Sequence, residues 1–130
     1  MNARNEGDLE PGFAVLEQNR VGALIIPGNA VFTGQRDQLA ALAARYRLPT
    51  MYNIREFVAA GGLMSYGGSI TDAYRQVGVY TGRILKGEKP GNLPVQQPTK
   101  FELVVNVKAA KAIGPTIPES FLARADEVIE

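Results

Sequence analysis

The sequence predicts an α/β domain: a small, mostly parallel sheet with flanking helices. Patterns typical of helices and of strands alternate from Asp8 to Leu85, which is characteristic of crossover units around about four parallel strands. The wholly apolar run 23–26 is typical of a strand covered on both faces. With 130 residues, 45% apolar and 21% charged, the chain fits one ordinary domain.

The elements follow from spacing, capping and breaking residues. Asp8 is a good N-cap, and Leu9, Phe13 and Leu16 then fall on one helical face, with Gly22 placed to stop the helix. The predicted strands are 23–26, 49–52, 63–66 and 101–106, and the further predicted helices are 35–46, 54–60, 71–85, 107–113 and 118–128.

The longest predicted helix begins at a cap formed by Ser69 or Thr71 and ends at Gly87. Gly78 and Gly82 lie one turn apart near its apolar face, where a neighbouring backbone could approach closely. Its apolar face consists of Ala73, Tyr74, Val77, Thr81, Ile84 and Leu85.

Composition excludes several functional classes. The chain has no Cys and no His, which excludes disulfides, thiol catalysis, His-based triads and the usual zinc or iron sites. Its formal net charge is only +1, with basic residues scattered, so no nucleic-acid footprint stands out. We therefore expect no enzyme activity, no cofactor, no metal and no nucleic-acid partner.

The first residues of the sequence show no export signal, and the first predicted element is not the strand with which such a domain usually begins. Residues 1–7 are polar and are expected to be disordered or tag-like, and no apolar h-region marks a signal peptide. The sequence has no run of about 20 apolar residues that would span a membrane. Doubly wound domains usually begin with a strand, whereas this chain begins with a helix, so we expect a domain truncated at its front.

The candidate site lies at the carboxyl ends of the predicted strands, where open α/β sheets bind ligands. This edge is predicted to gather Asn29, Asn53, Glu56, Ser65 and Tyr66. Asn29 has two interpretations, as a ligand contact through its amide or as an Asx turn that caps the next segment. The geometry indicates a small-molecule cleft without catalytic groups.

The glycine turn 67–69 also has two interpretations. It could hold a phosphate at the start of the long helix, although it lacks the P-loop and dinucleotide fingerprints. The favoured interpretation is a strand-to-helix turn that needs positive φ.

The charged and aromatic residues near the rim have structural interpretations as well. Glu56 is expected to be solvated or to bind a ligand amine, and Asp72 to be a first-turn residue favoured by the helix dipole. Arg55 could pair with a ligand carboxylate, and a solvated side chain is favoured. Tyr52 and Tyr66 could stack on a ligand ring or pack in the core or hinge.

Several segments in order resemble one known family. The glycine turn with a Tyr-containing helix, GRILKGEKP, LPVQQPTKFELVVN and IPESFLARADEVI resemble the carboxy-terminal part of ABC-transporter substrate-binding proteins of the tryptophan/tyrosine-uptake-like group. Members of this group have a type 1 periplasmic-binding-protein fold, in which two lobes close over a ligand. The match covers nearly the whole chain but less than half of a normal family member.

The resemblance implies that residues 8–130 form a C-terminal lobe and that residues 71–86 form a helix that packs on the other lobe. It implies reversible binding of a small polar solute such as an amino acid, with an ABC permease as the partner of the full-length protein and a periplasmic location. The chain as written lacks a signal peptide and would be cytoplasmic. The ligand contacts implied are Asn29, Ala30, Glu56, Ser65, Tyr66 and Gly67.

Three alternatives stay open at this stage. The chain could be an effector-binding module of a regulator, an enzyme on a flavodoxin-like sheet, or a ligand-free oligomeric remnant. Under each of these alternatives, no other predicted segment of the chain is expected to cover the apolar face of the helix 71–86. We therefore expect a homo-oligomer that buries this face.

Overall fold

The structure, a computed structural model, describes residues 6–130, so most of the predicted disordered segment 1–7 lies outside it. A short 3-10 turn, η1 (Glu6–Asp8), opens the described part, and a second, η2 (Pro90–Asn92), follows the longest helix. The strands are β1 (Leu24–Ile26), β2 (Thr50–Tyr52), β3 (Met64–Gly68), β4 (Phe101–Asn106) and β5 (Glu127–Ile129). The helices are α1 (Leu9–Gln18), α2 (Ala30–Gly34), α3 (Arg36–Arg45), α4 (Arg55–Ala59), α5 (Ile70–Leu85), α6 (Val107–Ile113) and α7 (Glu119–Leu122).

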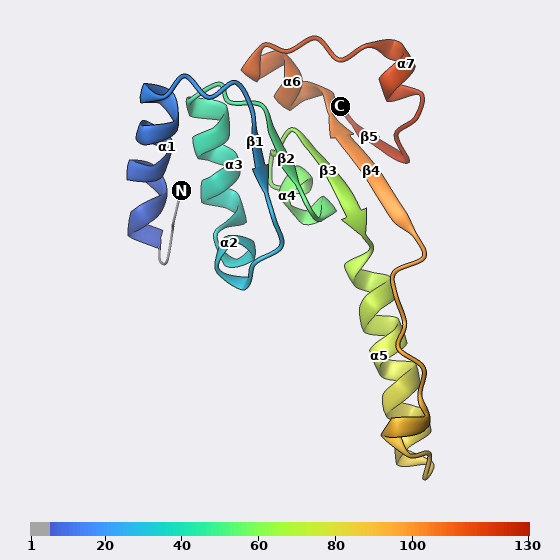
Figure 1. Cartoon of the computed structure of the whole chain (residues 1–130). Helices are drawn as coiled ribbons and strands as arrows, with labels where there is room; N and C mark the ends of the chain where they lie inside the picture. The colour runs from blue at the N-terminus through green and yellow to red at the C-terminus, as the bar shows by residue number, and fades with distance from the viewer. Residues whose placement is uncertain (1–5) are drawn as a thin grey trace.

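The five strands form one sheet in the order β1-β2-β3-β4-β5 (Figure 1). The first three strands are parallel, β4 runs antiparallel to β3, and β5 is parallel to β4. This confirms the predicted fold class. The estimate of four strands was one too low, because β5 begins at the end of the segment 118–128 that the sequence predicted to be helical.

One face of the sheet is packed against helices. Leu9 and Phe13 of α1, Leu39 of α3 and Phe57 of α4 have no solvent exposure and form one apolar core with the strands. Asn106 lies on this face, where its amide donates to the Val58 carbonyl of α4 at 3.4 Å. The helix-face patterns therefore identified the core on this side correctly.

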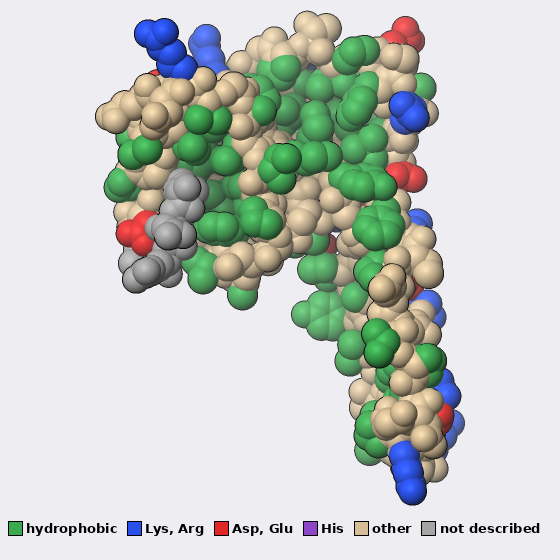
Figure 2. All heavy atoms as spheres, in the orientation of Figure 1, with side chains coloured by type: hydrophobic (Ala, Val, Ile, Leu, Met, Phe, Trp, Pro, Cys, Tyr) green, Lys and Arg blue, Asp and Glu red, His purple; other side chains and the backbone are tan. Residues whose placement is uncertain are grey.

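The opposite face is open at the β1 edge, which corrects the expectation that the run 23–26 is covered on both faces. Ile25 of β1 is 73% exposed. Strand register places Ile25, Met51, Met64, Val105 and Val128 on this face. Ile25 and Val128 are exposed at its edges, whereas Val105 of β4 is fully buried. The space-filling view shows a broad apolar area over the body of the molecule (Figure 2).

Helix α5 leaves the sheet after β3 and extends away from the body as an arm, and residues 86–100 return beside it (Figure 1). Ser69 begins the helix, since its hydroxyl accepts a hydrogen bond from the Asp72 N–H at 3.3 Å. The Tyr80 hydroxyl fastens the return segment by donating to the Pro94 carbonyl at 2.6 Å. None of the residues of α5 is buried.

Candidate functional site

Three loops meet at one edge of the sheet. Strands β1, β2 and β3 are parallel, so the segments that follow Ile26, Tyr52 and Gly68 leave from the same side. Strand β4 begins at this edge too, because Phe101 pairs with Gly68 in antiparallel register. The predicted strand-end rim therefore exists, and α5 and the return segment form a wall beside it.

Asn53 lies at the centre of this rim, held between two glycines. A Cβ at Gly67 would overlap the Asn53 carbonyl oxygen and lie 2.9 Å from its carbonyl carbon. A Cβ at Gly28 would lie 2.7 Å from Asn53 Nδ2. Gly67 needs glycine because the Asn53 backbone approaches it closely, whereas at Gly28 the contact is with the end of the Asn53 side chain, which could move. The Oδ1 atom of Asn53 is shielded from solvent and has no hydrogen-bond partner within residues 6–130.

A cleft of about 500 Å³ opens beside Asn53, between the rim and the first turns of α5. This volume lies within the range of about 300–1,000 Å³ that is usual for small-molecule sites. The amides of Asn53, Gln76, Gln96 and Gln97 can both donate and accept hydrogen bonds. The full lining consists of Asn53, Ile54, Gly68, Ser69, Ile70, Asp72, Ala73, Gln76, Val77, Tyr80, Gln96, Gln97, Pro98, Thr99 and Lys100.

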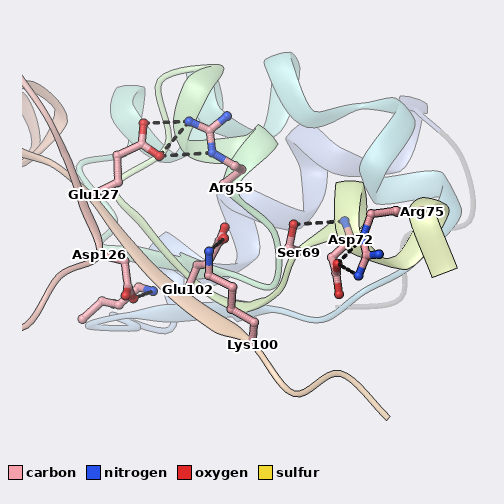
Figure 3. A network of polar contacts seen from close by, with 9 residues as sticks. Arg55, Ser69, Asp72, Arg75, Lys100, Glu102, Asp126 and Glu127 are labelled. Atoms are coloured by element: carbon pink, nitrogen blue, oxygen red, sulfur yellow. Dashed lines mark hydrogen bonds and ion pairs between the residues drawn. The ribbon is translucent and has the colours of Figure 1, made fainter. Parts of the chain in front are cut away.

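The charges that line the cleft are already engaged within the chain (Figure 3). Asp72 pairs with Arg75 at 3.0 Å, and Lys100 pairs with Glu102 at 3.3 Å. The cleft therefore offers a solute mostly neutral hydrogen-bonding groups and apolar contacts. This favours a small solute with several donors and acceptors.

Asn29 and Ala30, which the sequence analysis proposed as ligand contacts, lie at the start of α2. The Oδ1 atom of Asn29 accepts a hydrogen bond from the Val31 N–H at 2.8 Å, so the capping interpretation describes this side chain. Both residues are exposed. Helix α2 itself was missing from the sequence prediction.

Ser65 and Tyr66 point to opposite faces of the sheet, as neighbours in a strand do. Ser65 is fully buried on the helix-covered face, and its hydroxyl finds no partner in the described part of the chain. Tyr66 is 54% exposed on the open face, where it stacks on Phe101 with ring centroids 5.8 Å apart. The two side chains cannot contact one ligand from the same side.

Glu56 lies half-buried in α4, and its Oε2 atom is shielded without a hydrogen-bond partner among the described residues. Gly67 lies directly under Asn53. None of the six residues predicted for the site lines the cleft, whereas Asn53 and Gly68, their neighbours in the chain, do. The sequence analysis placed Asn53 at this edge because it directly follows a strand, but did not count it among the ligand contacts.

The glycine turn has a different physical role from the predicted one. Neither Gly67 nor Gly68 has positive φ. Gly67 allows the close approach of Asn53, and a Cβ at Gly68 would lie 3.1 Å from Pro98 Cβ. Packing of neighbouring segments, and not a left-handed backbone, therefore requires these glycines.

Arg55 is neither free in solvent nor available to a ligand carboxylate. Its guanidinium donates to both carboxylate oxygens of Glu127, with Nη2–O distances of 2.7 Å, and so links α4 to β5 (Figure 3). This hydrogen-bonded contact with Glu127 raises the pKa of Arg55 above its usual range. Tyr52 is also structural, since it is buried and stacks on Phe57 with centroids 4.6 Å apart.

Two further properties bear on the class of site. Within residues 6–130 no group of acidic side chains is arranged to hold a metal ion. No helix of that same part is long and apolar enough to cross a bilayer.

An α/β sheet with an open cleft at its strand ends has the arrangement of a small-molecule-binding domain. A family model for ABC transporter substrate binding proteins matches residues 1–129, so the chain belongs to this family. This confirms the resemblance found in the sequence. No curated protein matches the chain.

Solved structures agree with this assignment. A conserved domain protein from Vibrio cholerae is 25% identical, with a TM-score of 0.89 over 98% of this chain. An ABC domain from Streptococcus pneumonia in complex with L-Trp is 26% identical, with a TM-score of 0.88 over 99%. A substrate binding protein from Clostridium difficile shares the fold at 18% identity, with a TM-score of 0.66 over 100%. The present chain spans 43% of each of these proteins.

Proposed function

We propose that residues 8–130 form the C-terminal lobe of a solute-binding protein for an ABC importer, and that the cleft beside Asn53 binds part of a small polar solute. The observation on which this rests is the close approach of Gly28 and Gly67 to Asn53 at the strand ends, beside a cleft of about 500 Å³. Family membership supports it, because such proteins bind and release a solute without transforming it. We accordingly propose no catalytic step.

Amino acids are the proposed solute class. The Streptococcus protein of the same fold holds L-Trp. In the present cleft, side-chain amides offer donors and acceptors to ammonium and carboxylate groups, and Ile54, Val77 and Tyr80 offer apolar contacts to a side chain. Asn53 lines the cleft, and its Oδ1 atom, shielded in this lobe, would reach a donor such as an ammonium group only after the side chain turns towards the cleft.

The proposal includes the ligand contacts that the family resemblance implies. Asn29, Ala30, Glu56, Ser65, Tyr66 and Gly67 surround or support the rim, and Asn53 is added as its central contact. In a full-length protein the helix 71–86 would pack on the other lobe, the permease would be the protein partner, and the site would face the extracytoplasmic side. These assignments rest on the family.

The isolated chain is expected to bind weakly. Small-molecule sites typically bury 70–90% of the ligand, and one lobe supplies roughly half of the contacts. A loss of about 4 kcal/mol raises a dissociation constant about a thousandfold, which turns a micromolar site into a millimolar one. We therefore expect millimolar dissociation constants.

Calorimetry of the 130-residue chain with a panel of aromatic and aliphatic L-amino acids tests this proposal. At least one amino acid should bind with a millimolar dissociation constant, and Asn53→Ala should abolish the heat. Asn92→Ala, at an exposed asparagine in η2, is the matched control and should leave binding unchanged. Absence of binding for the whole panel at about 50 mM would overturn the proposed solute class, and a dissociation constant of about 10 μM or below would overturn the assignment as a single lobe.

A further inference from the structure

The side chain of Asn53 rests away from the cleft that this residue lines. Its Nδ2 atom lies so near Gly28 that a Cβ added there would come within 2.7 Å of it. Gly28 follows β1 and does not itself line the cleft. The Oδ1 atom of Asn53 is shielded from solvent and has no hydrogen-bond partner among residues 6–130. This resting position therefore turns the amide away from a solute and leaves a shielded acceptor unpaired, which is unfavourable.

The backbone is fixed on both sides of this contact. The carbonyl of Asn53 packs directly on Gly67 of β3, so the loop after β2 has no room to shift on that side. The segment after β1 is held by Asn29, whose Oδ1 accepts from the Val31 N–H at 2.8 Å and whose carbonyl accepts from the Thr33 N–H at 2.9 Å. The Asn53 side chain, with its staggered χ1 positions, is therefore the part that can change place.

We propose that Gly28 is a positioning residue that sets the solute affinity of the cleft, because it gives the Asn53 amide a resting place turned away from the solute. This inference rests on the proposed function. Without a solute the amide lies against Gly28. With a solute it turns into the cleft, where its Oδ1 accepts a hydrogen bond from the solute and is no longer unpaired.

The resting place lowers the observed affinity of the lobe. When the state that binds holds only a fraction of the population, the observed dissociation constant rises by the inverse of that fraction. Minor states of proteins typically hold about 0.1–10% of the population. A turned amide populated at about 10% weakens binding about tenfold, and a substitution that closes the resting place recovers this factor.

Gly28→Ala closes the resting place. The backbone accepts alanine there, because the φ of Gly28 is not positive and the obstacle to the new Cβ is the end of the Asn53 side chain. Calorimetry with the same panel of aromatic and aliphatic L-amino acids should give dissociation constants about tenfold lower than those of the wild type. The double variant Gly28→Ala/Asn53→Ala should show no heat of binding, because the gain depends on the Asn53 amide.

Gly34→Ala is the matched control. Gly34 is an exposed glycine at the end of α2, where no side chain or other segment of the described chain lies within 4 Å of the added Cβ. Its φ is not positive either, so the same substitution should leave the dissociation constants at their wild-type values. A gain as large as that of Gly28→Ala would overturn the proposal, since the effect would then not come from the resting place.

A measurement without solute tests the resting position directly. In nuclear magnetic resonance spectra of the wild type, the Nδ2 protons of Asn53 should show Overhauser contacts with the Hα protons of Gly28. Gly28→Ala should remove these contacts, and added solute should weaken them in the wild type. Their absence from the solute-free wild type would overturn the proposal.

The binding data separate a failure of this inference from a failure of the proposed function. Dissociation constants that Gly28→Ala leaves unchanged or raises would overturn the role of Gly28 while the solute site stands. Binding by the double variant would do the same. If no amino acid of the panel binds to any of these proteins, the proposed function fails and the role of Gly28 in affinity fails with it, even where the solute-free contact is present.

Discussion

Substitution of Gly67 by alanine tests how the rim is built. The added Cβ would overlap the Asn53 carbonyl oxygen and come within 2.9 Å of its carbonyl carbon. The obstacle is backbone, which cannot turn away as a flexible side chain can, so the loop after β2 must move. Overpacking of this kind costs about 1–3 kcal/mol, and a backbone obstacle places Gly67→Ala near the upper end.

A loss of about 3 kcal/mol corresponds to a melting temperature lower by roughly 9–15 °C for a domain of this size. Calorimetric melting and urea titration measure this loss, with the urea midpoint shifted and the slope unchanged. Gly22→Ala is the control, since no atom lies within 4 Å of its added Cβ and its φ is not positive. A melting temperature of Gly67→Ala within about 2 °C of this control would refute the close-approach argument.

Two further predictions concern buried and half-buried polar groups. Burial raises the pKa of Tyr52 from 10.0 to about 12, so the neutral phenol stabilises the fold below pH 10 and this contribution is lost as pH rises towards 12. Between pH 10 and 12, urea titration should show that the free energy of unfolding of wild type falls by about 2–3 kcal/mol more than that of Tyr52→Phe. An equal fall for the two proteins would contradict this. Glu127→Gln should cost less than about 1 kcal/mol, because its ion pair with Arg55 is half exposed, and the cost should vanish in 1 M NaCl. Glu130→Gln is the control, and a salt-independent loss would contradict an electrostatic origin.

Elements with clear periodicity and caps could be predicted from the sequence. The predicted helix 35–46 appears as α3, one residue shorter at each end, and the predicted strand 101–106 appears as β4 with the same bounds. Ser69 is one of the two caps proposed for α5. Helix α2 is too short for a helical repeat to be visible. Strand β5 follows α7 so closely that its three residues read as a continuation of the helix.

The site depended on contacts that local sequence does not encode. Asn29 at a strand end fits a ligand contact and an N-cap equally well, and only the bond to Val31 decides between them. The role of Asn53 depends on its approach to Gly28 and Gly67, which are distant from it in sequence. The exposure of Ile25 likewise depends on what covers the sheet, and the apolar run alone indicated burial on both faces.

Solute binding in the cleft at the strand ends can be followed residue by residue, in a nuclear magnetic resonance titration with the best-binding amino acid of the panel. The amide signals of Asn53, Gly68, Ser69 and Gln97 should shift together and fit one millimolar dissociation constant, because these residues line the same cleft. The amide signals of Phe13 and Val21, on the far side of the core, should stay in place. Shifts confined to that far side, or no saturable shift at the cleft, would contradict the claim.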